Sequence, residues 1–336
     1  MSTDEVLKYK SCDVFEEGFK KIEDNNSFNR KDVVGKETSD ILISTISFMA
    51  LTFIALTVGA ISYMKNGSMT RFILYFALFL FIIVISLAIV SAVTISKDPM
   101  RLVYAASSHI SRYERTTPFL DVVEYFPEHV EFEAAHRVIK DEVNNVCEHM
   151  DSIPLTNSTF GDRNNNIGSD VREEDGQEVG WRVMLVSIGE NITPDGEAFC
   201  PELVKLIRKH NDKIMSCAIS ILPPHTAIPR HVGYYKGVFR YMLAVEVPED
   251  RENVYLCNND EKFNWEEGKS VTFDDTFPHK VFNLSDQRRI VLYMDIIRPL
   301  KSETLDSMNR WIIKKMKESG VAKKEVSSTE NLVKLR

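Results

Sequence analysis

Cysteine is scarce in this sequence, and positive charge is not in excess. The five cysteines, at positions 12, 147, 200, 217 and 257, show no CxxC spacing and leave one unmatched, so neither a zinc ribbon nor a dense disulfide framework is indicated. Cys200 and Cys217 would be able to pair in an oxidising compartment, but buried free thiols are the more common state of core cysteines. A formal net charge of −8 argues against nucleic acid as a partner.

The N-terminal end lacks the apolar run of a signal peptide. Residues 1–40 are polar and of mixed charge, so no cleavable signal is predicted. Two long uncharged runs follow, 24 residues at 41–64 and 25 residues at 72–96. About 20 apolar residues in a helix cross a bilayer, and a helix satisfies its own backbone groups there. Residues 41–96 are therefore predicted to form a hairpin of two transmembrane helices, and two buried core helices are the alternative.

The sequence does not decide the membrane side of the soluble part. Basic residues flanking the two runs slightly favour cytoplasmic termini by the positive-inside rule. Two glycosylation sequons, Asn157-Ser-Thr and Asn191-Ile-Thr, favour the opposite side. We therefore predict an integral membrane protein of the endomembrane system or plasma membrane and leave both orientations open.

The chain beyond the hairpin divides into a helical lead-in, a domain of short strands and a helical tail. Residues 97–155 show helical periodicity, and 156–180 predicts a polar surface loop that opens the domain at 156–300. That domain has one helix, at CPELVKLIRKH, and the strand candidates GWRVMLVSIG, IMSCAISIL, VFRYMLAVEV, VYLCNN, KSVTFDD, KVFNL and RRIVLYMDII. Short strands with turn signals predict a closed or sandwiched antiparallel sheet. Residues 301–336 predict a helix with a basic end and a frayed tail.

Two arginines stand inside strands that are otherwise apolar. By alternation along a strand, Arg240 shares a face with Met242, and Arg289 shares a face with Tyr293. A buried arginine is costly unless an anion lies beside it, and guanidinium binds a carboxylate in bidentate fashion. Ser220, on another strand, is placed to add a hydroxyl donor. The alternatives are pairing of Arg289 with Asp286 or Asp295, pairing of Arg240 with Glu246 or Asp274, and a register in which Arg288 replaces Arg289.

Two histidines, His231 and His279, stand 48 residues apart at the edges of strand-like runs. Imidazole suits iron, zinc or copper, and two histidines leave open the coordination positions that a catalytic metal needs. Non-haem iron sites usually add a carboxylate two residues after the first histidine, where this chain has Gly233. Asp274 and Asp275 are candidates for the missing carboxylate, although shaping the turn before His279 is the more common role for aspartates there.

Four blocks carry a resemblance to a known family: SILPPHTAIPRHVG, GVFRYMLAVEVP, WEEGKSVTFDDTFPHKVFN and RRIVLYMDIIRP. Together they resemble the aspartyl/asparaginyl β-hydroxylases, over roughly 180–299 and more weakly back to Phe126. The resemblance implies a mainly β fold, a double-stranded β-helix (cupin-like jelly roll) with flanking helices. It also implies Fe(II)- and 2-oxoglutarate-dependent oxygenase chemistry, with O2 as co-substrate and ascorbate as a candidate reductant. The family includes animal enzymes that hydroxylate Asp or Asn in epidermal-growth-factor-like domains, and bacterial hydroxylases of the lipid A acyl chain.

The resemblance also implies roles for single residues. His231 and His279 would ligate the iron, and the animal branch of the family likewise has glycine at the position of Gly233. Arg289, with Ser220 beside it, would hold the distal carboxylate of 2-oxoglutarate. Arg240 would lie near the co-substrate's other carboxylate.

Two positions depart from the family pattern. Met242 stands where related proteins commonly have histidine, and Val238 where the animal branch has an arginine that helps to bind the substrate's acid. Together with the membrane hairpin, these departures favour a lipid acyl or sphingoid chain as the substrate. The alternatives are hydroxylation of Asp or Asn in a protein substrate, a catalytically silent membrane-tethered binding module, and a zinc hydrolase.

Overall fold

A computed structural model describes residues 100–155, 172–174, 177–329 and 332–335, together with single positions between 61 and 84. The predicted N-terminal segment 1–40, and nearly all of the predicted transmembrane helices at 41–64 and 72–96, lie outside the described residues, as does most of the predicted loop at 156–180. In the described part of the chain, no helix combines the length and the apolar character needed to cross a bilayer. Residues 103–336 fall in one compact unit and residues 22–102 in another.

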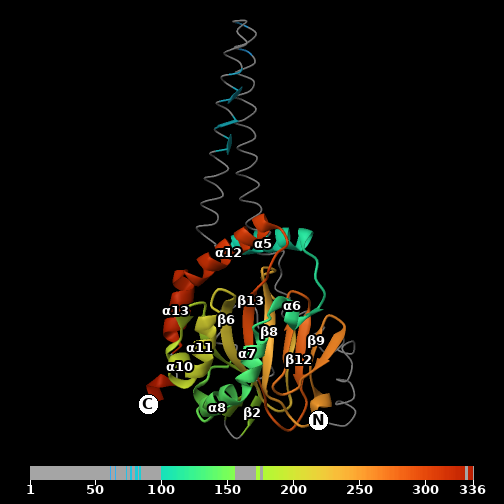
Figure 1. The fold of residues 1–336 in the computed structure, drawn as a ribbon, viewed down its shortest axis with the longest axis vertical. Helices are drawn as coiled ribbons and strands as arrows, with labels where there is room; N and C mark the ends of the chain where they lie inside the picture. Colours follow the sequence, from blue (N-terminus) through green and yellow to red (C-terminus); the bar gives the residue numbers. More distant parts are fainter. Residues whose placement is uncertain are drawn as a thin grey trace. The chain divides into compact units, whose positions relative to one another are not determined.

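Two antiparallel sheets form the body of the unit that contains residues 103–336 (Figure 1). The larger sheet has seven strands in the order β1-β11-β8-β13-β6-β4-β5, and the smaller has four in the order β10-β9-β12-β7. The strands of the larger sheet are β1 (Phe119–Leu120), β4 (Arg182–Ile188), β5 (Asn191–Ile192), β6 (Ile214–Leu222), β8 (Val238–Glu246), β11 (Ser270–Phe273) and β13 (Arg289–Ile297). Those of the smaller sheet are β7 (Thr226–His231), β9 (Val254–Asn258), β10 (Glu261–Asn264) and β12 (His279–Asn283), and β2 (Arg172–Glu174) pairs with β3 (Gln177–Val179) as a separate hairpin. The mainly β prediction is confirmed.

One face of each sheet fills the space between them. A single apolar cluster joins residues of the larger sheet, such as Ala218 and Val291, to residues of the smaller sheet, such as Leu256 and Val281. Met242 belongs to the same cluster, whereas the neighbouring residues of β8, including Tyr241, belong to the cluster on the opposite face. The strand faces are therefore those that alternation predicts. Polar residues on the inner faces, described below, are enclosed by this core.

Helices cover the outer face of the larger sheet (Figure 1). They are α6 (Val122–Tyr125), α7 (His129–Ala134), α8 (His136–Cys147), α10 (Pro194–Phe199) and α11 (Pro201–Lys209). The predicted helix CPELVKLIRKH is α11, and both α10 and α11 begin at a proline, whose fixed φ suits the first helical position. Thr193 caps α10 by accepting a hydrogen bond from the Gly196 N–H at 2.9 Å.

The lead-in and the tail supply further helices, α5 (Met100–Tyr113), α12 (Glu303–Lys317) and α13 (Gly320–Ser328), and short 3₁₀ turns lie at Met150–Ser152, Arg251–Asn253 and Val333–Leu335. The predicted helix after residue 300 is α12. The prediction that the tail is frayed is wrong. Ser319 caps α13, and Leu332 is buried, with its N–H donating to Asp195 at 3.1 Å. A buried side chain and a buried acceptor together hold the C-terminal end against the domain.

Strand β7 is missing from the predicted strands, which place its residues in a connection. The segment contains Pro229, which lacks an N–H and so argues against a central strand. In the structure β7 is the edge strand of the smaller sheet, which is a position where proline is tolerated. Cys200 and Cys217, for which the sequence left a disulfide or free thiols open, are both buried free thiols.

Candidate active site

Two histidines that lie 48 residues apart in the sequence face each other between adjacent strands. His231 ends β7, His279 begins β12, and the two residues are partners in the register of these antiparallel strands. Their ring centroids lie 4.0 Å apart. His279 is buried and His231 is half-buried, so the pair lies at the rim of the space between the sheets. Two imidazoles this close are able to share one ion.

The protonation of His279 follows from its surroundings. Its Nδ1 lies 3.0 Å from the carbonyl oxygen of Phe277, and because a carbonyl only accepts, Nδ1 carries the proton. Burial, and then the neighbouring His231, lower the pKa of His279 well below its ordinary value. The ring is therefore neutral, with its lone pair on Nε2, which is the form of histidine that binds metals.

Arg289 begins β13 and points into the space between the sheets, where only 1% of it is exposed. Its Nη1 lies 3.4 Å from the Ser220 hydroxyl, while its Nε and Nη2 are buried with no hydrogen-bond partner among the described residues. The ring of Trp265 lies against the guanidinium, at 5.4 Å from centroid to Cζ. Burial lowers the pKa of Arg289 to about 9. A buried cation with two unused donors indicates a site for an anion.

The structure decides between the alternatives predicted for Arg289, which are a salt bridge to an aspartate and replacement by Arg288. Asp295 accepts hydrogen bonds from Arg240 and Ser216, and Asp286 lies beside His225, so the predicted alternative of a salt bridge from Arg289 to either aspartate is wrong. Arg288 directly precedes β13 and points away from the space between the sheets, where its guanidinium contacts the carboxylate of Glu246 at 2.8 and 3.1 Å. Arg289 is therefore the inward residue of the two.

Ser220 connects Arg289 to an indole. The Trp181 Nε1–H donates to the Ser220 hydroxyl oxygen at 2.9 Å, and Arg289 approaches the same oxygen. Because that oxygen receives both contacts, the hydroxyl proton of Ser220 remains for a further acceptor. Ser220 thus lies beside Arg289, as predicted, and Trp181 holds it there.

Arg240 has two carboxylate partners within the chain. Its Nε donates to Asp295 at 2.8 Å and its Nη2 donates to Asp275 at 3.0 Å. The predicted alternative partners are wrong, because Glu246 pairs with Arg288 and Asp274 with Lys236. The role of Arg240 toward a co-substrate carboxylate stays a prediction.

Asp275 is the functional candidate that sequence reasoning left among the turn-forming residues. A Cβ built on Gly233 would lie 2.3 Å from the Asp275 carboxylate, so this carboxylate occupies the space that a side chain at position 233 would fill. Its Oδ2 contacts Arg240, and its Oδ1 is buried without a hydrogen-bond partner among the described residues. Burial raises the pKa of Asp275 to about 7, against the lowering effect of Arg240. Gly233, two residues after His231, is the feature of the sequence from which this position of Asp275 could have been predicted.

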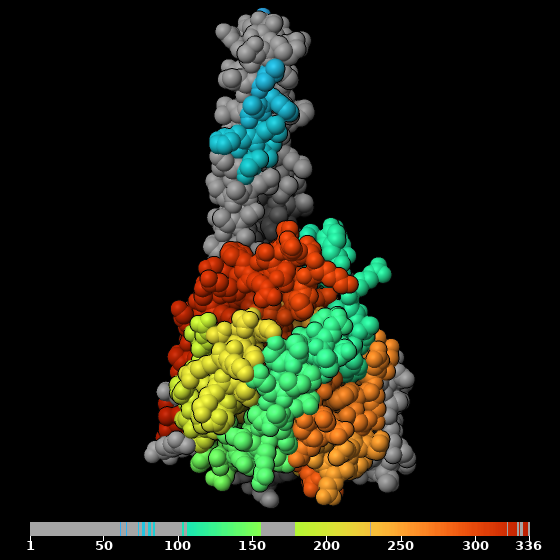
Figure 2. Space-filling view, in the orientation of Figure 1, coloured from blue at the N-terminus to red at the C-terminus, as the bar shows by residue number. Residues whose placement is uncertain are grey.

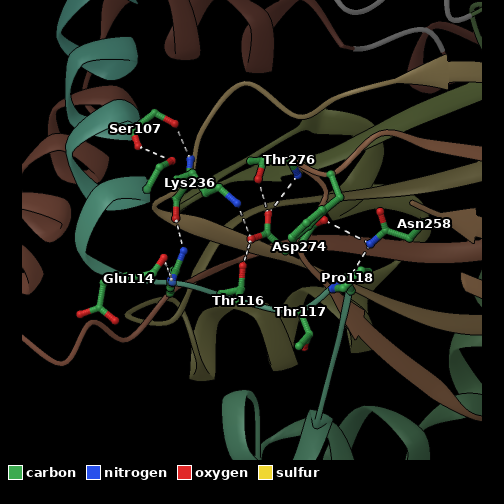
Figure 3. Close-up of polar contacts among 12 residues, drawn as sticks. Ser107, Glu114, Thr116, Thr117, Pro118, Lys236, Asn258, Asp274 and Thr276 are labelled. Atoms are coloured by element: carbon green, nitrogen blue, oxygen red, sulfur yellow. Dashed lines mark hydrogen bonds and ion pairs between the residues drawn. The ribbon is translucent and has the colours of Figure 1, made fainter. Parts of the chain in front are cut away.

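Asp274, in contrast, organises the turn, as predicted (Figure 3). Its Oδ1 accepts from the Thr276 N–H at 3.0 Å, and its Oδ2 accepts from the Lys236 ammonium at 2.8 Å and the Thr116 hydroxyl at 2.5 Å. The Asp274 N–H donates to the Pro118 carbonyl at 3.0 Å. Thr116 and Pro118 follow α5, so the helical lead-in directly supports the loop that carries Asp275 and His279.

The part of the chain that the structure describes contains no group of three or more His, Cys, Asp or Glu side chains arranged to hold a metal ion. Val238 and Met242 are both buried, and Met242 is part of the apolar cluster between the sheets. On the same inner face, the Arg240 guanidinium lies over the Tyr293 ring, 4.7 Å from its centroid. Val238 and Met242 thus flank Arg240 on an inner face that combines apolar side chains with the ion pairs of Arg240.

The fold and the site define a protein of two antiparallel sheets with a histidine pair and a buried arginine on their inner faces. Comparison with known proteins gives the family. Residues 133–299 match the family model of the aspartyl/asparaginyl β-hydroxylases, and this part of the chain belongs to that family. The ornithine lipid ester-linked acyl 2-hydroxylase of Rhizobium tropici is 28% identical over 206 residues, which are 61% of this chain and 66% of that protein. The human aspartyl/asparaginyl β-hydroxylase is 32% identical over 80 residues, 24% of this chain and 10% of that protein. The chain thus spans just under two thirds of the first relative's length and a tenth of the second's.

Two solved cupin domains match short parts of this chain. A cupin domain from Bordetella pertussis matches with a TM-score of 0.20 and 16% identity, covering 24% of this chain and 79% of that one. A cupin domain of a transcriptional regulator from Enterobacter cloacae matches with a TM-score of 0.22 and 16% identity, covering 25% and 82%. Each likeness is confined to about a quarter of this chain.

Proposed function

We propose that this protein is a membrane-anchored hydroxylase that depends on Fe(II) and 2-oxoglutarate and acts on a lipid acyl or sphingoid chain. The observation that carries the proposal is the buried guanidinium of Arg289, whose Nε and Nη2 have no partner among the described residues. It lies in the same enclosed space between the sheets that the histidine pair borders. An anionic co-substrate beside a metal accounts for both features.

The residues present fit a metal site. His231 and His279 would hold the ion, because their rings are adjacent and His279 is a neutral imidazole with Nε2 unprotonated. The buried Oδ1 of Asp275 provides an acceptor beside them. Arg240 holds Asp275 through its other oxygen. Asp275 would therefore position a water or substrate group at the metal, and Arg240 acts through Asp275.

The residues also fit 2-oxoglutarate. The two free donors of Arg289 match the bidentate geometry of a carboxylate, and the hydroxyl of Ser220 supplies a third donor. Trp265 lies against the Arg289 guanidinium on one side and contributes no charge. A dicarboxylate that is held at Arg289 by one end would keep its other end for the metal.

When bound, Fe(II) with 2-oxoglutarate supplies the oxidising power to insert one oxygen atom into a C–H bond. The net reaction is R–H + O2 + 2-oxoglutarate → R–OH + succinate + CO2, which balances. The chain's own part is to bind and to orient. Arg289 and Ser220 would hold the co-substrate, the histidines would hold the metal, and the apolar side chains around Met242 would exclude water from the reacting carbon.

The apolar wall favours a lipid substrate. Val238 and Met242 are buried and offer no charge to an acidic side chain, and Arg240 is already neutralised by Asp275 and Asp295. A relative of this chain is named as an acyl 2-hydroxylase of a lipid. Aspartyl or asparaginyl hydroxylation of a protein is the second candidate, favoured by the name of the human relative. It would need a free cationic group, whereas Arg240 on this wall already pairs with two aspartates.

Membrane anchorage rests on the uncharged runs and on exposed apolar side chains. Ile73, Phe81 and Val84, among the single described positions, are all more than half exposed, as helices that face lipid would be. We assign the protein to the endomembrane system or plasma membrane.

The sequon at Asn191 is an unsuitable glycosylation site. The Asn191 side-chain amide donates to the backbone carbonyls of Ile188 and Lys317, and Thr193 is fully buried. This removes one argument against a cytoplasmic domain.

The test is succinate release by the full-length protein with Fe(II), ascorbate and 2-oxoglutarate, together with mass spectrometry of lipids and proteins from cells that express it. We expect turnover and a new species heavier by one oxygen in the lipid fraction. His279→Ala should abolish both. His225→Asn is the matched control, because His225 is an exposed loop residue with φ 51, a conformation that asparagine tolerates.

Other outcomes identify the alternatives. An added oxygen in the protein fraction alone would point to the aspartyl/asparaginyl candidate. A metal-loaded protein without any succinate release would favour the silent binding module. Zinc-dependent hydrolysis that ignores 2-oxoglutarate would identify the zinc hydrolase.

A further inference from the structure

Three elements of the unit that contains residues 103–336 carry exposed apolar side chains. They lie at the end of α5, in the loop between β7 and β8, and on α12. The residues are Tyr113 (62% exposed), Val232 (52%), Tyr234 (44%) and Trp311 (53%). Single exposed apolar residues are ordinary on a surface, but three of these four are aromatic, and all four lie on elements that hydrogen bonds join.

Hydrogen bonds tie these three elements together. The backbone N–H of Lys236, in the β7–β8 loop, donates to the Ser107 hydroxyl of α5 at 3.0 Å. The Tyr235 hydroxyl donates to Asn309 of α12 at 2.7 Å. The N–H of Lys301, just before α12, donates to Glu114 at 3.0 Å. The loop that begins one residue after His231 is therefore held between α5 and α12, at one end of the domain (Figure 1).

Helix α12 presents a basic face around its exposed tryptophan. Its apolar residues Leu305, Ile312 and Ile313 are buried against the domain, while Trp311 and its neighbours Arg310, Lys314 and Lys315 are exposed. Figure 2 shows α12 and α13, in red, spread over the surface. Ion pairs link these basic residues to Asp306 and Glu318, but exposed pairs of this kind stabilise little. Residues 301–318 contain five basic and three acidic residues, in a chain whose net charge is −8.

The composition of this face suits a bilayer surface. Tryptophan and tyrosine favour the membrane interface, and basic residues near the surface favour anionic lipid.

We propose that the face formed by Tyr113, Val232, Tyr234 and Trp311, which we call the aromatic face, docks on the surface of an anionic phospholipid bilayer. The proposal rests on the proposed membrane anchorage, and it deepens the proposed function by naming a lipid that stays in the bilayer as the substrate. Because the β7–β8 loop belongs to this face and starts next to His231, docking would bring the opening of the site to the lipid surface. An acyl chain would then enter without crossing water.

Fluorescence of the full-length protein in lipid nanodiscs tests the docking. The chain has three tryptophans, and Trp181 and Trp265 lie inside the domain, so the difference between the native protein and Trp311→Phe isolates Trp311. In nanodiscs of phosphatidylcholine and phosphatidylserine, we expect a phospholipid with a spin label near its headgroup to quench the Trp311 emission. Acrylamide in the water should quench it poorly. Lys314→Glu with Lys315→Glu should abolish the gain in lipid quenching that phosphatidylserine brings.

A matched variant places the exposed indole away from the aromatic face. Val138 is exposed on α8, and Trp311→Phe combined with Val138→Trp moves the exposed indole to another surface. We expect that indole to be quenched by acrylamide and not by the lipid label. If Trp311 behaves in the same way as the indole at position 138, the proposal is overturned. The measurement needs neither iron nor 2-oxoglutarate, so lipid quenching without turnover would keep the docking and refute the hydroxylase, and turnover without lipid quenching would do the reverse.

Discussion

Gly233 and Asp275 share one space beside the histidine pair. The N–H of Gly233 donates to the backbone carbonyl of Asp275 at 2.7 Å, and a Cβ at position 233 would lie 2.3 Å from the Asp275 carboxylate. The glycine therefore does not leave the site without a carboxylate. It makes room for the carboxylate of Asp275, which lies in the loop before His279 and is held by Arg240.

Gly233→Ala should separate activity from stability. The added methyl group displaces the Asp275 carboxylate, because contacts below 3.0 Å cannot persist. We expect succinate release to fall by on the order of 100-fold, as for small misplacements of reacting groups, while the free energy of unfolding falls by about 1–3 kcal/mol. Activity assays and urea unfolding measure the two effects. Gly320→Ala is the control, because a Cβ at Gly320 meets no atom within 4 Å, and equal activity of both variants would contradict the role of the shared space.

Local sequence patterns gave most of the sheet, because long apolar strands such as β6 and β13 carry their signal within one segment. Arg289 stood out for the same reason, since a charge inside an apolar strand is costly. Strand β7 and Asp275 were not predictable in this way. The pairing of β7 depends on its position at the sheet edge, and the roles of Asp274 and Asp275 depend on residues as distant as Thr116, 158 positions away in the sequence. Such contacts exist only once the chain has folded.

Arg289→Met should weaken co-substrate binding and stabilise the protein that lacks co-substrate. The guanidinium is buried without a carboxylate partner among the described residues, and replacing a buried charge by an apolar side chain of similar size is often stabilising by about 1–4 kcal/mol. We expect a higher Tm without 2-oxoglutarate, no further rise in Tm when it is added, and a Kd for it raised by on the order of 100-fold. Differential scanning fluorimetry with and without 2-oxoglutarate reads all three.

Arg288→Gln is the neighbouring control for this experiment. Arg288, directly before the same strand, contacts Glu246 outside the space between the sheets, so its loss should leave the response to 2-oxoglutarate unchanged. A lower Tm for Arg289→Met, with normal 2-oxoglutarate binding, would instead assign Arg289 a purely structural role.

Trp181→Phe should weaken 2-oxoglutarate binding by a smaller amount. The indole donates to Ser220 at 2.9 Å, and phenylalanine keeps the ring but removes the donor, so the Ser220 hydroxyl is free to rotate away from Arg289. A neutral hydrogen bond is worth about 1 kcal/mol, which corresponds to a KM for 2-oxoglutarate raised about fivefold. We expect kcat to change less than KM. Steady-state succinate release measures both, with Trp311→Phe in detergent as the control that should leave KM unchanged.

Asp274 should make the free energy of unfolding depend on pH in the acidic range. Burial alone would raise the pKa of Asp274, but hydrogen bonds from Lys236, Thr116 and Thr276 outweigh it and hold the pKa below its ordinary value. A carboxyl whose pKa is lower in the fold than in the unfolded chain, where Asp titrates near about 3.9, stabilises the fold above that pH. The contribution is lost as the pH falls through the lower folded value.

Asp274→Asn should therefore lower the free energy of unfolding by about 3 kcal/mol at neutral pH, because it leaves the ammonium of Lys236 without its charged partner. It should also flatten the fall in stability below about pH 4. Urea unfolding over a pH series measures both effects. Asp286→Asn is the control, since the Asp286 side chain is 95% exposed and its loss should change neither. If Asp274→Asn kept the acid dependence of the native protein, the buried contacts among Thr116, Lys236 and Asp274 would not be what anchors the lead-in to the loop before His279.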